Sequence, residues 1–156
     1  MARYHLQTPF SEEAIRQLRA GDIVHFDGTL FGIRDLTQIY MFDQHHEPPV
    51  SLKGMPCIHT APSLKKVDGK WVPICVGTTT SYRMERFTPP LIENYGVRAI
   101  IGKGGLYEQS LEAMKNAAPS IWRLWAARRP WRPSRLSRWS RFTGSISIRR
   151  RSISFG

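Results

Sequence analysis

The sequence predicts an α/β domain. Short apolar runs typical of strands alternate along the chain with amphipathic segments typical of helices, and no internal repeat is visible. The chain has 156 residues, which is enough for one ordinary domain and too few for two full ones. Chemistry that needs a second large domain must therefore come from a partner.

The first third of the chain is predicted to form two helices, at residues 12–19 and 34–42, and two strands, at residues 22–26 and 29–33. Ser11 provides a hydroxyl N-cap for the first helix, and Gly21 follows its end. The turn sequence Asp27–Gly28 separates the two strands. Residues 44–54 contain adjacent His and Pro pairs and are predicted to form a loop.

Three apolar runs predict further strands, at residues 56–59, 71–76 and 97–101. A polar connection at residues 65–70 joins the first two of these strands, with Asp68–Gly69 as its turn. Helices are expected at residues 91–95, where Gly96 provides the C′ position, and at residues 108–117.

The positive charge lies in the C-terminal tail. The whole chain has 23 Lys and Arg against 12 Asp and Glu, a formal net charge of +11. Residues 119–156 contain ten Arg and no acid, which leaves +1 for residues 1–118. Four of the five Trp also lie in this tail, and the spacing of its Pro residues disfavours a helix. The near-neutral body gives no reason to infer a nucleic-acid partner from the basic isoelectric point.

Local composition disfavours membrane and disulfide-rich classes. No run approaches the roughly 20 apolar residues of a membrane-spanning helix, and residues 1–5 lack the apolar core of a signal peptide, so we expect a cytoplasmic protein. Cys57 and Cys75 are the only cysteines, which predicts reduced thiols. Two cysteines without a CxxC spacing cannot by themselves hold a four-thiolate zinc or iron–sulfur site.

The most informative segment runs from Val76 to Glu85, where a predicted strand ends and a helix begins. Gly77 allows a close backbone turn, residues 78–81 supply four hydroxyls, and the free amides of a helix N-terminus favour an anion. Arg83 adds a guanidinium suited to a carboxylate. Two interpretations remain open at this level: an anion site, or a hydroxyl N-cap that bonds only its own backbone.

Two other turns follow strands and also carry a cation. Lys103 lies between glycines, in a segment that does not match a Walker A loop and that also suits a flexible turn with a solvated lysine. Arg34 follows another strand, and on its own it is explained by a surface ion pair with Asp35. Because ligands bind at the carboxyl ends of strands in open α/β sheets, Arg34, Arg83 and Lys103 are predicted to enclose a small dianion.

The histidines are not predicted to be catalytic. Adjacent side chains point apart at His45, His46 and Glu47, and their loop lacks a further ligand of the usual spacing, so we expect a solvated loop rather than a metal site. His25 and His59 lie in apolar strand patterns and are expected to be half-buried structural residues.

Four motifs occur in order along residues 6 to about 117: Leu6-Gln7-Thr8-Pro9-Phe10-Ser11 with Gly21-Asp22-Ile23-Val24, Gly28-Thr29-Leu30 leading to Arg34-Asp35, Gly77-Thr78-Thr79-Thr80-Ser81-Tyr82-Arg83-Met84-Glu85, and Ile101-Gly102-Lys103-Gly104-Gly105. With these motifs the sequence resembles the β subunit, or equivalently the C-terminal domain, of the iron–sulfur hydro-lyases that comprise class I fumarate hydratase and L(+)-tartrate dehydratase.

The resemblance implies a swivelling β/β/α domain that closes over a [4Fe–4S] cluster held by three cysteines of a partner, the α subunit, so this chain alone should be inactive. The cluster would act as a Lewis acid on the hydroxyl of a C4 dicarboxylate. The resemblance also implies that Arg34, Arg83, Lys103 and Thr80 bind the dicarboxylate and that Thr79 abstracts the proton. A hydroxyl is a poor base, so Thr79 needs a cation or a partner group to stabilise its deprotonated form. No metal ligand is expected in this chain.

The sequence departs from the family pattern at two places in the body. Thr78 stands where the pattern has Pro, which frees the turn and adds a donor. Leu36-Thr37-Gln38 replaces the usual Ala-Ala-His after Arg-Asp, so a role of that histidine does not transfer to this chain.

The tail departs further. Relatives continue with a run rich in Ala, Val and Gly, and reading the codons of residues 119–133 one nucleotide out of phase permits that run. We therefore expect a hydro-lyase domain at residues 1–118 whose C-terminal part is incomplete or disordered, followed by the product of a reading-frame slip. The alternative hypothesis is a non-catalytic binding module whose Arg/Trp tail contacts RNA or acidic partners.

Overall fold

The computed structural model describes residues 2–19, 21–117, 120–123 and 141–147. In these residues the strands are β1 Arg3–Gln7, β2 Ile23–Thr29, β3 Phe31–Ile33, β4 Pro56–Val67, β5 Lys70–Thr78, β6 Ala99–Gly102, β7 Ser120–Arg123 and β8 Arg141–Ser147. The helices are α1 Glu12–Arg16, α2 Asp35–Gln38, α3 Thr88–Glu93 and α4 Glu108–Ala117, with a π-helix at Ile39–Asp43 and a 3₁₀ helix at Ser81–Phe87. The predicted α/β class is confirmed.

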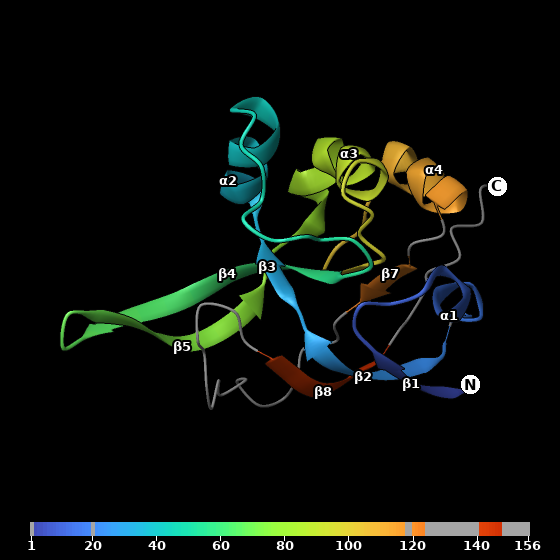
Figure 1. Ribbon diagram of the computed structural model, residues 1–156, viewed down its shortest axis with the longest axis horizontal. Helices are drawn as coiled ribbons and strands as arrows, with labels where there is room; N and C mark the ends of the chain where they lie inside the picture. Colours follow the sequence, from blue (N-terminus) through green and yellow to red (C-terminus); the bar gives the residue numbers. More distant parts are fainter. Residues whose placement is uncertain (1, 20, 118–119, 124–140, 148–156) are drawn as a thin grey trace.

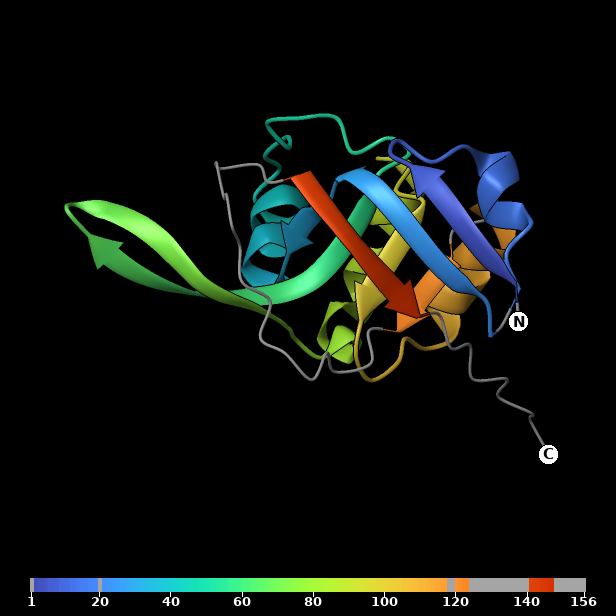
Figure 2. The same cartoon turned by 90° about the horizontal axis from the view of Figure 1, so that it is seen from below.

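Two sheets and a layer of helices lie on top of one another (Figures 1 and 2). One sheet has the strand order β1–β2–β8, and the other has the order β3–β4–β6–β7 with β5 paired to β4. Helices α2, α3 and α4 cover the face of the second sheet that is turned away from the first sheet (Figure 1). The layers therefore follow a β/β/α order, while swivelling of this unit against a partner stays a prediction.

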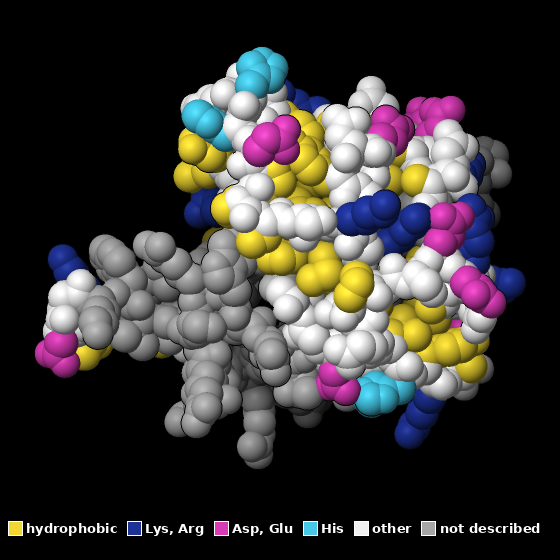
Figure 3. All heavy atoms as spheres, in the orientation of Figure 1, with side chains coloured by type: hydrophobic (Ala, Val, Ile, Leu, Met, Phe, Trp, Pro, Cys, Tyr) yellow, Lys and Arg dark blue, Asp and Glu magenta, His cyan; other side chains and the backbone are white. Residues whose placement is uncertain are grey.

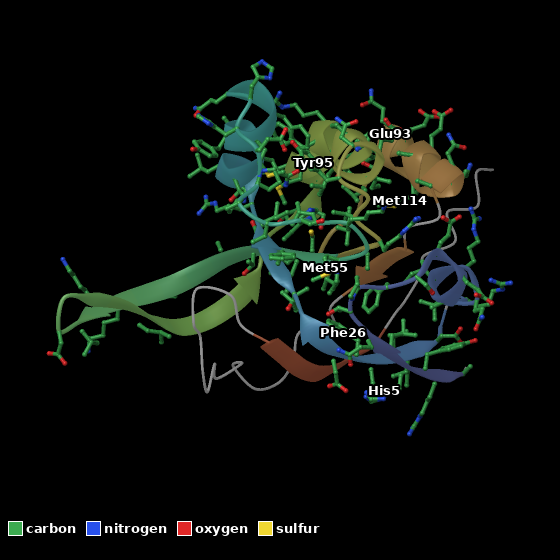
Figure 4. All side chains as sticks on the ribbon, viewed as in Figure 1. His5, Phe26, Met55, Glu93, Tyr95 and Met114 are labelled. Atoms are coloured by element: carbon green, nitrogen blue, oxygen red, sulfur yellow. The ribbon has the colours of Figure 1, made fainter. Side chains whose placement is uncertain are left out.

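The second sheet is apolar on both faces because it separates two parts of the core. Ile100 of β6 packs in the cluster on the helix side, whereas its neighbours Ala99 and Ile101 pack in the cluster on the side of the first sheet. Alternate residues of a strand point to opposite faces, so one strand serves both clusters. Figure 4 shows Phe26 between the sheets and Met114 on the helix side.

β2 continues through the Asp27–Gly28 sequence that we expected to form a turn. Gly28 has a φ of 120°, and a Cβ at this position would lie 2.0 Å from the Thr8 hydroxyl. The same hydroxyl accepts a hydrogen bond from the Thr29 N–H at 2.8 Å. The prediction of a turn was wrong, because the glycine serves a close approach of two chain segments.

Strands β4 and β5 form a hairpin that extends away from the layers (Figures 1 and 2). Asp68 and Gly69 form its turn with φ values of 50° and 76°, as a two-residue hairpin turn requires. The predicted turn is therefore confirmed. The two strands extend up to it, so the polar connection predicted at residues 65–70 is mostly strand.

Helix α1 begins where the sequence predicts and ends earlier. The Ser11 hydroxyl accepts a hydrogen bond from the Ala14 N–H at 3.1 Å, which confirms the N-cap. The helix stops at Arg16 instead of residue 19. The Asp22 carboxylate accepts the N–H of Arg19 at 2.8 Å, so that amide is used by a turn instead of by the helix.

The remaining helices match the predicted positions with shifted ends. α2 stops at Gln38, and the π-helix forms the rest of the helix predicted to residue 42. α3 starts earlier than predicted, at Thr88, and α4 matches its predicted bounds. None of the helices in the described part of the chain has the length and apolar character that a bilayer span requires.

Two segments of the tail are strands, where we expected no regular structure. β7 pairs in parallel with β6, and β8 pairs antiparallel with β2. Backbone hydrogen bonding at a sheet edge needs no particular side-chain pattern, which is why the tail composition did not predict these strands. The rest of the tail lies outside the described residues, and the predicted disorder with it.

Candidate functional site

The segment that follows β5 brings Thr79 and Arg83 into contact. The Nη2 group of Arg83 donates a hydrogen bond to the Oγ1 atom of Thr79 at 2.7 Å. The N–H of Thr79 donates to the carbonyl of His59 in β4 at 2.8 Å, which holds Thr79 against the second sheet. A guanidinium beside a hydroxyl favours the deprotonated form, because positive charge stabilises adjacent negative charge. This is the kind of cation that a threonine needs to act as a base.

Asp35 joins the segment after β3 to the segment after β5. The Nε group of Arg34 donates to Asp35 Oδ1 at 3.0 Å, and the Nη1 atom of Arg83 lies 3.8 Å from Asp35 Oδ2. Hydrogen bonds from Arg34 and from the N–H of Leu36, together with the charge of Arg83, lower the pKa of Asp35. Asp35 is therefore an ionised bridge between the two arginines, where the sequence alone also allowed an isolated surface pair.

The segment after β6 lies against the segment after β5. Thr80 and Lys103 form a parallel β-bridge, and the N–H of Ser81 donates to the carbonyl of Lys103 at 2.9 Å. Gly104 has a φ of 84°, and a Cβ there would lie 3.1 Å from the Cγ2 atom of Thr80. A glycine is thus required for this close approach. Together with the Asp35 bridge, these contacts bring all five predicted site residues into one neighbourhood.

The charges of this neighbourhood suit a dianion, but the site is open in the isolated chain. Three cations, Arg34, Arg83 and Lys103, and one carboxylate, Asp35, leave a net charge of +2. The side chains of Arg34 and Arg83 are 42% and 55% exposed, so water screens their charges. Figure 3 shows basic and acidic side chains interspersed on one face of the described surface, as expected for a near-neutral body.

The turn at residues 77–81 differs from its predicted details. Gly77 lies within β5, paired with Ala61, and does not form the close turn that we expected. Its carbonyl accepts a hydrogen bond from the Thr60 hydroxyl at 2.7 Å, so contacts with β4 keep this segment extended. Thr80 is the N-cap of the 3₁₀ helix and makes no side-chain cap hydrogen bond. The interpretation of a self-satisfied hydroxyl cap is therefore wrong at Thr80.

His59 is fully buried, whereas the sequence predicted a half-buried residue. It lies in β4, which is covered by β3 and β6 at its sides and by the two core clusters on its faces. Burial lowers the pKa of His59 to about 4. The uninterrupted apolar run at residues 56–58 is the signal that could have predicted this, because it is typical of a strand covered on both faces. His25 is half-buried, as predicted.

Two buried polar side chains near the site lack partners. Neither ring nitrogen of His59 and neither amide atom of Gln38 has a hydrogen-bond partner among the described residues. Gln38 is fully buried on α2, and its N–H donates to the carbonyl of Arg34 at 3.1 Å. It stands where the family pattern has a histidine, and sequence alone gave it no role.

Ser81 and Gly102 pack closely under the site. A Cβ on Gly102 would lie 2.0 Å from the Ser81 hydroxyl oxygen and 3.4 Å from His59 Nδ1. Ser81 is buried, and the carbonyl of Lys103, the residue after Gly102, accepts its N–H. Ser81 and Gly102 belong to two separate sequence motifs, and the sequence did not predict their contact because they are distant along the chain.

The described residues contain no group of three or more His, Cys, Asp or Glu side chains that could hold a metal ion. Cys57 has a free thiol that is sealed in the core, where burial raises its pKa. His45, His46 and Glu47 are exposed, and the His46 ring stacks on Tyr40 with centroids 3.9 Å apart. These side chains do not fit an iron–sulfur cluster.

Replacing Gly102 by Ala is expected to lower the free energy of unfolding by about 1–3 kcal/mol, because the new methyl group would overlap the Ser81 side chain. Rotation of Ser81 gives incomplete relief, since its Cβ would still lie 3.3 Å away. Gly105→Ala is the control: no atom lies within 4 Å of its added Cβ, so a change under about 0.5 kcal/mol is expected. Urea unfolding followed by circular dichroism measures both, and equal effects would contradict the packing.

The burial of His59 predicts a pH-dependent stability. Its pKa is about 4 in the folded chain against 6.5 when unfolded, so the unfolded chain binds more protons between these values. Stability should therefore fall as the pH is lowered from 6.5 to 4, and His59→Leu should remove roughly 3 kcal/mol of this loss. The prediction is tested by measuring the free energy of unfolding of the wild type and of His59→Leu at several pH values in this range. Parallel plots of free energy against pH would contradict it, because they would show that the pKa of His59 is the same in the folded and unfolded chains.

Comparison with known proteins gives one family. Residues 1–120 match the model of the family described as "Fumarase C-terminus". Over 111 residues the chain is 39% identical to "Putative fumarate hydratase class I" of Geobacillus stearothermophilus, covering 70% of this chain and 21% of that protein. Over 101 residues it is 37% identical to "L(+)-tartrate dehydratase subunit beta" of Escherichia coli K12, covering 65% of this chain and 50% of that protein.

The chain thus spans half or less of the length of these relatives. The family match nevertheless covers most of the chain, including every residue of the candidate site. The predicted resemblance is confirmed: the chain belongs to the fumarase C-terminus family.

Proposed function

We propose that this chain is the β-subunit part of an iron–sulfur hydro-lyase that reversibly adds or removes water on a C4 dicarboxylate, either fumarate/malate or tartrate/oxaloacetate. Arg34, Arg83, Lys103 and Thr80 bind the carboxylates, and Thr79 abstracts the carbon-bound proton. The observation that carries this proposal is the 2.7 Å hydrogen bond from Arg83 to Thr79 inside a cluster of net charge +2. The names of the two relatives support the reaction class.

The arginines have donors left for a ligand. Within the described residues, Arg34 contacts Asp35 through Nε, which leaves both of its Nη groups for a carboxylate. The Nη1 atom of Arg83 lies 3.8 Å from Asp35, beyond hydrogen-bond distance. A planar guanidinium binds a carboxylate through two parallel hydrogen bonds, so each arginine can bind one carboxylate of a diacid. A dianion would also balance the +2 charge, whereas a monoanion would not.

Thr79 then acts on the bound diacid. In the dehydration direction its deprotonated Oγ1 takes a proton from the carbon next to a carboxylate, and the electron pair of that C–H bond forms the double bond. The hydroxyl on the adjacent carbon leaves with its bonding pair as hydroxide, which takes up a proton from solvent and departs as water. Hydration runs the same steps in reverse. The Arg83 hydrogen bond supports this role because it lowers the free energy of the deprotonated hydroxyl.

The partner in this proposal is a cysteine-bearing α subunit. The side chain of Arg83 is 55% exposed in this chain, and a charged site gains strength when a partner excludes water from it. In this proposal the [4Fe–4S] group is held by cysteines of the partner, where it would supply a Lewis acid for the hydroxyl.

We also propose that the hydro-lyase domain ends near residue 118 and that the following residues arise from a reading-frame slip. The end of the family match at residue 120 supports this boundary. Resequencing the gene is expected to reveal a one-nucleotide difference near codon 118 that restores a run rich in Ala, Val and Gly. An intact frame would contradict the proposal.

The reaction is tested by anaerobic co-expression of the full chain with a candidate α subunit and by absorbance assays of fumarate hydration and tartrate dehydration. Arg83→Ala is expected to lower kcat/KM about 100-fold, because a charged hydrogen bond to substrate and the cation beside Thr79 are both lost. No turnover of either substrate by a cluster-loaded complex would refute the proposed activity.

Arg86→Ala provides the matched control, because Arg86 lies on the same 3₁₀ helix as Arg83 and both side chains are more than half exposed. Its two Nη groups donate to the two carboxylate oxygens of Asp43, which is not one of the predicted site residues. We expect kcat/KM within about threefold of the wild-type value, since an exposed ion pair contributes little. Equal losses in both variants would show that the effect is not specific to the site.

A further inference from the structure

His59 lies where three segments of the candidate site meet. Its backbone carbonyl accepts the N–H of Thr79 at 2.8 Å. In the parallel pairing of β3 and β4 it is opposite Ile33, the residue before Arg34. Its Nδ1 atom lies 3.4 Å from the position of a Cβ on Gly102, the residue before Lys103. A change at His59 can therefore reach each of these segments.

The side chain of His59 is an unusual group for this position. Both ring nitrogens are buried without a partner among the described residues. Buried polar groups in native proteins nearly always have a hydrogen-bond partner, and an unpaired one destabilises the fold. An apolar side chain of similar volume would avoid this cost, so stability alone does not explain the imidazole.

Ser81 is the polar side chain placed to pair with it. The Ser81 Oγ atom and His59 Nδ1 approach the same point, the site of a Cβ that Gly102 lacks, at 2.0 Å and 3.4 Å. A change of the Ser81 side-chain rotamer, or one water molecule between the two atoms, would complete this contact. Ser81 in turn donates its N–H to Lys103 and follows Thr79 and Thr80 directly.

We propose that His59 is a positioning residue whose Nδ1 atom accepts a hydrogen bond from the Ser81 hydroxyl, directly or through one buried water, and thereby holds Thr79 and Lys103 in place. The positioning of Thr79 for catalysis rests on the proposed hydro-lyase function, whereas the His59–Ser81 contact does not. Burial lowers the pKa of His59 to about 4, so the ring is neutral at pH 7 and keeps the free lone pair that an acceptor needs.

The contact is tested by nitrogen-15 NMR of the full chain at pH 7 with labelled histidine. The chain has five histidines, and His59→Leu identifies the resonances of His59. Ser81→Ala should shift the Nδ1 resonance of His59 by several ppm toward the value of an acceptor without a hydrogen bond. Ser51→Ala, in the exposed loop before β4, should leave it unchanged. The same Nδ1 shift in wild type and Ser81→Ala would overturn the proposal.

The positioning role is tested in the complex with the α subunit. His59→Leu should lower kcat about tenfold or more and change KM less than about twofold, because the base is misplaced while the cations remain. His59→Asn should recover kcat to within about threefold of wild type, since its amide reproduces the polar atom at the Nδ1 position. An unchanged kcat in His59→Leu would overturn the positioning role.

Thermal unfolding separates this role from a structural one. His59→Leu should unfold close to the wild-type temperature, because loss of the Ser81 contact is offset by removal of Nε2, which has no partner among the described residues. If His59→Leu loses kcat only because less of it is folded, as its unfolding temperature would show, the positioning role is contradicted. If the wild-type complex turns over neither substrate, the hydro-lyase function fails, and the NMR comparison still decides the contact.

Discussion

The hydrogen bonds from β4 to the end of β5 and to the residue that follows it are the constraint on which the candidate site depends. The carbonyl of His59 holds the N–H of Thr79, and the hydroxyl of Thr60 holds the carbonyl of Gly77. β4 is itself paired with β3 on one side and β6 on the other, the strands that precede Arg34 and Lys103. One central strand therefore sets the relative positions of all three cation-bearing segments.

Asp35 sets the net charge of the site that a ligand must balance. Three cations alone would repel one another, and the carboxylate between two of them reduces that repulsion while leaving +2 for a diacid. Exposure of both arginines weakens the site in the isolated chain, since water competes for their donors. The same exposure suits a face that a partner covers, as the proposed α subunit would.

Local signals in the sequence were sufficient for most elements, whereas the assignment of the site residues stays a prediction. The N-cap at Ser11, the Asp68–Gly69 turn and helix α4 follow from local backbone preferences, and the structure confirms them. The role of Gly28, the full burial of His59 and the contact of Gly102 with Ser81 arise from segments far apart in the chain. Local patterns do not encode such contacts, and the pairing of β8 with β2 was missed for the same reason.

In the proposed site, the three separate segments after β3, β5 and β6 bind one dianion together. A titration of the full chain with succinate, followed by backbone-amide NMR, tests it most directly. The amide resonances of residues 34–36, 79–83 and 102–104 are expected to shift together with a single dissociation constant, and propionate, a monoanion, is expected to have a much weaker effect. Shifts confined to one segment, separate dissociation constants for the three, or an equal response to propionate would contradict it.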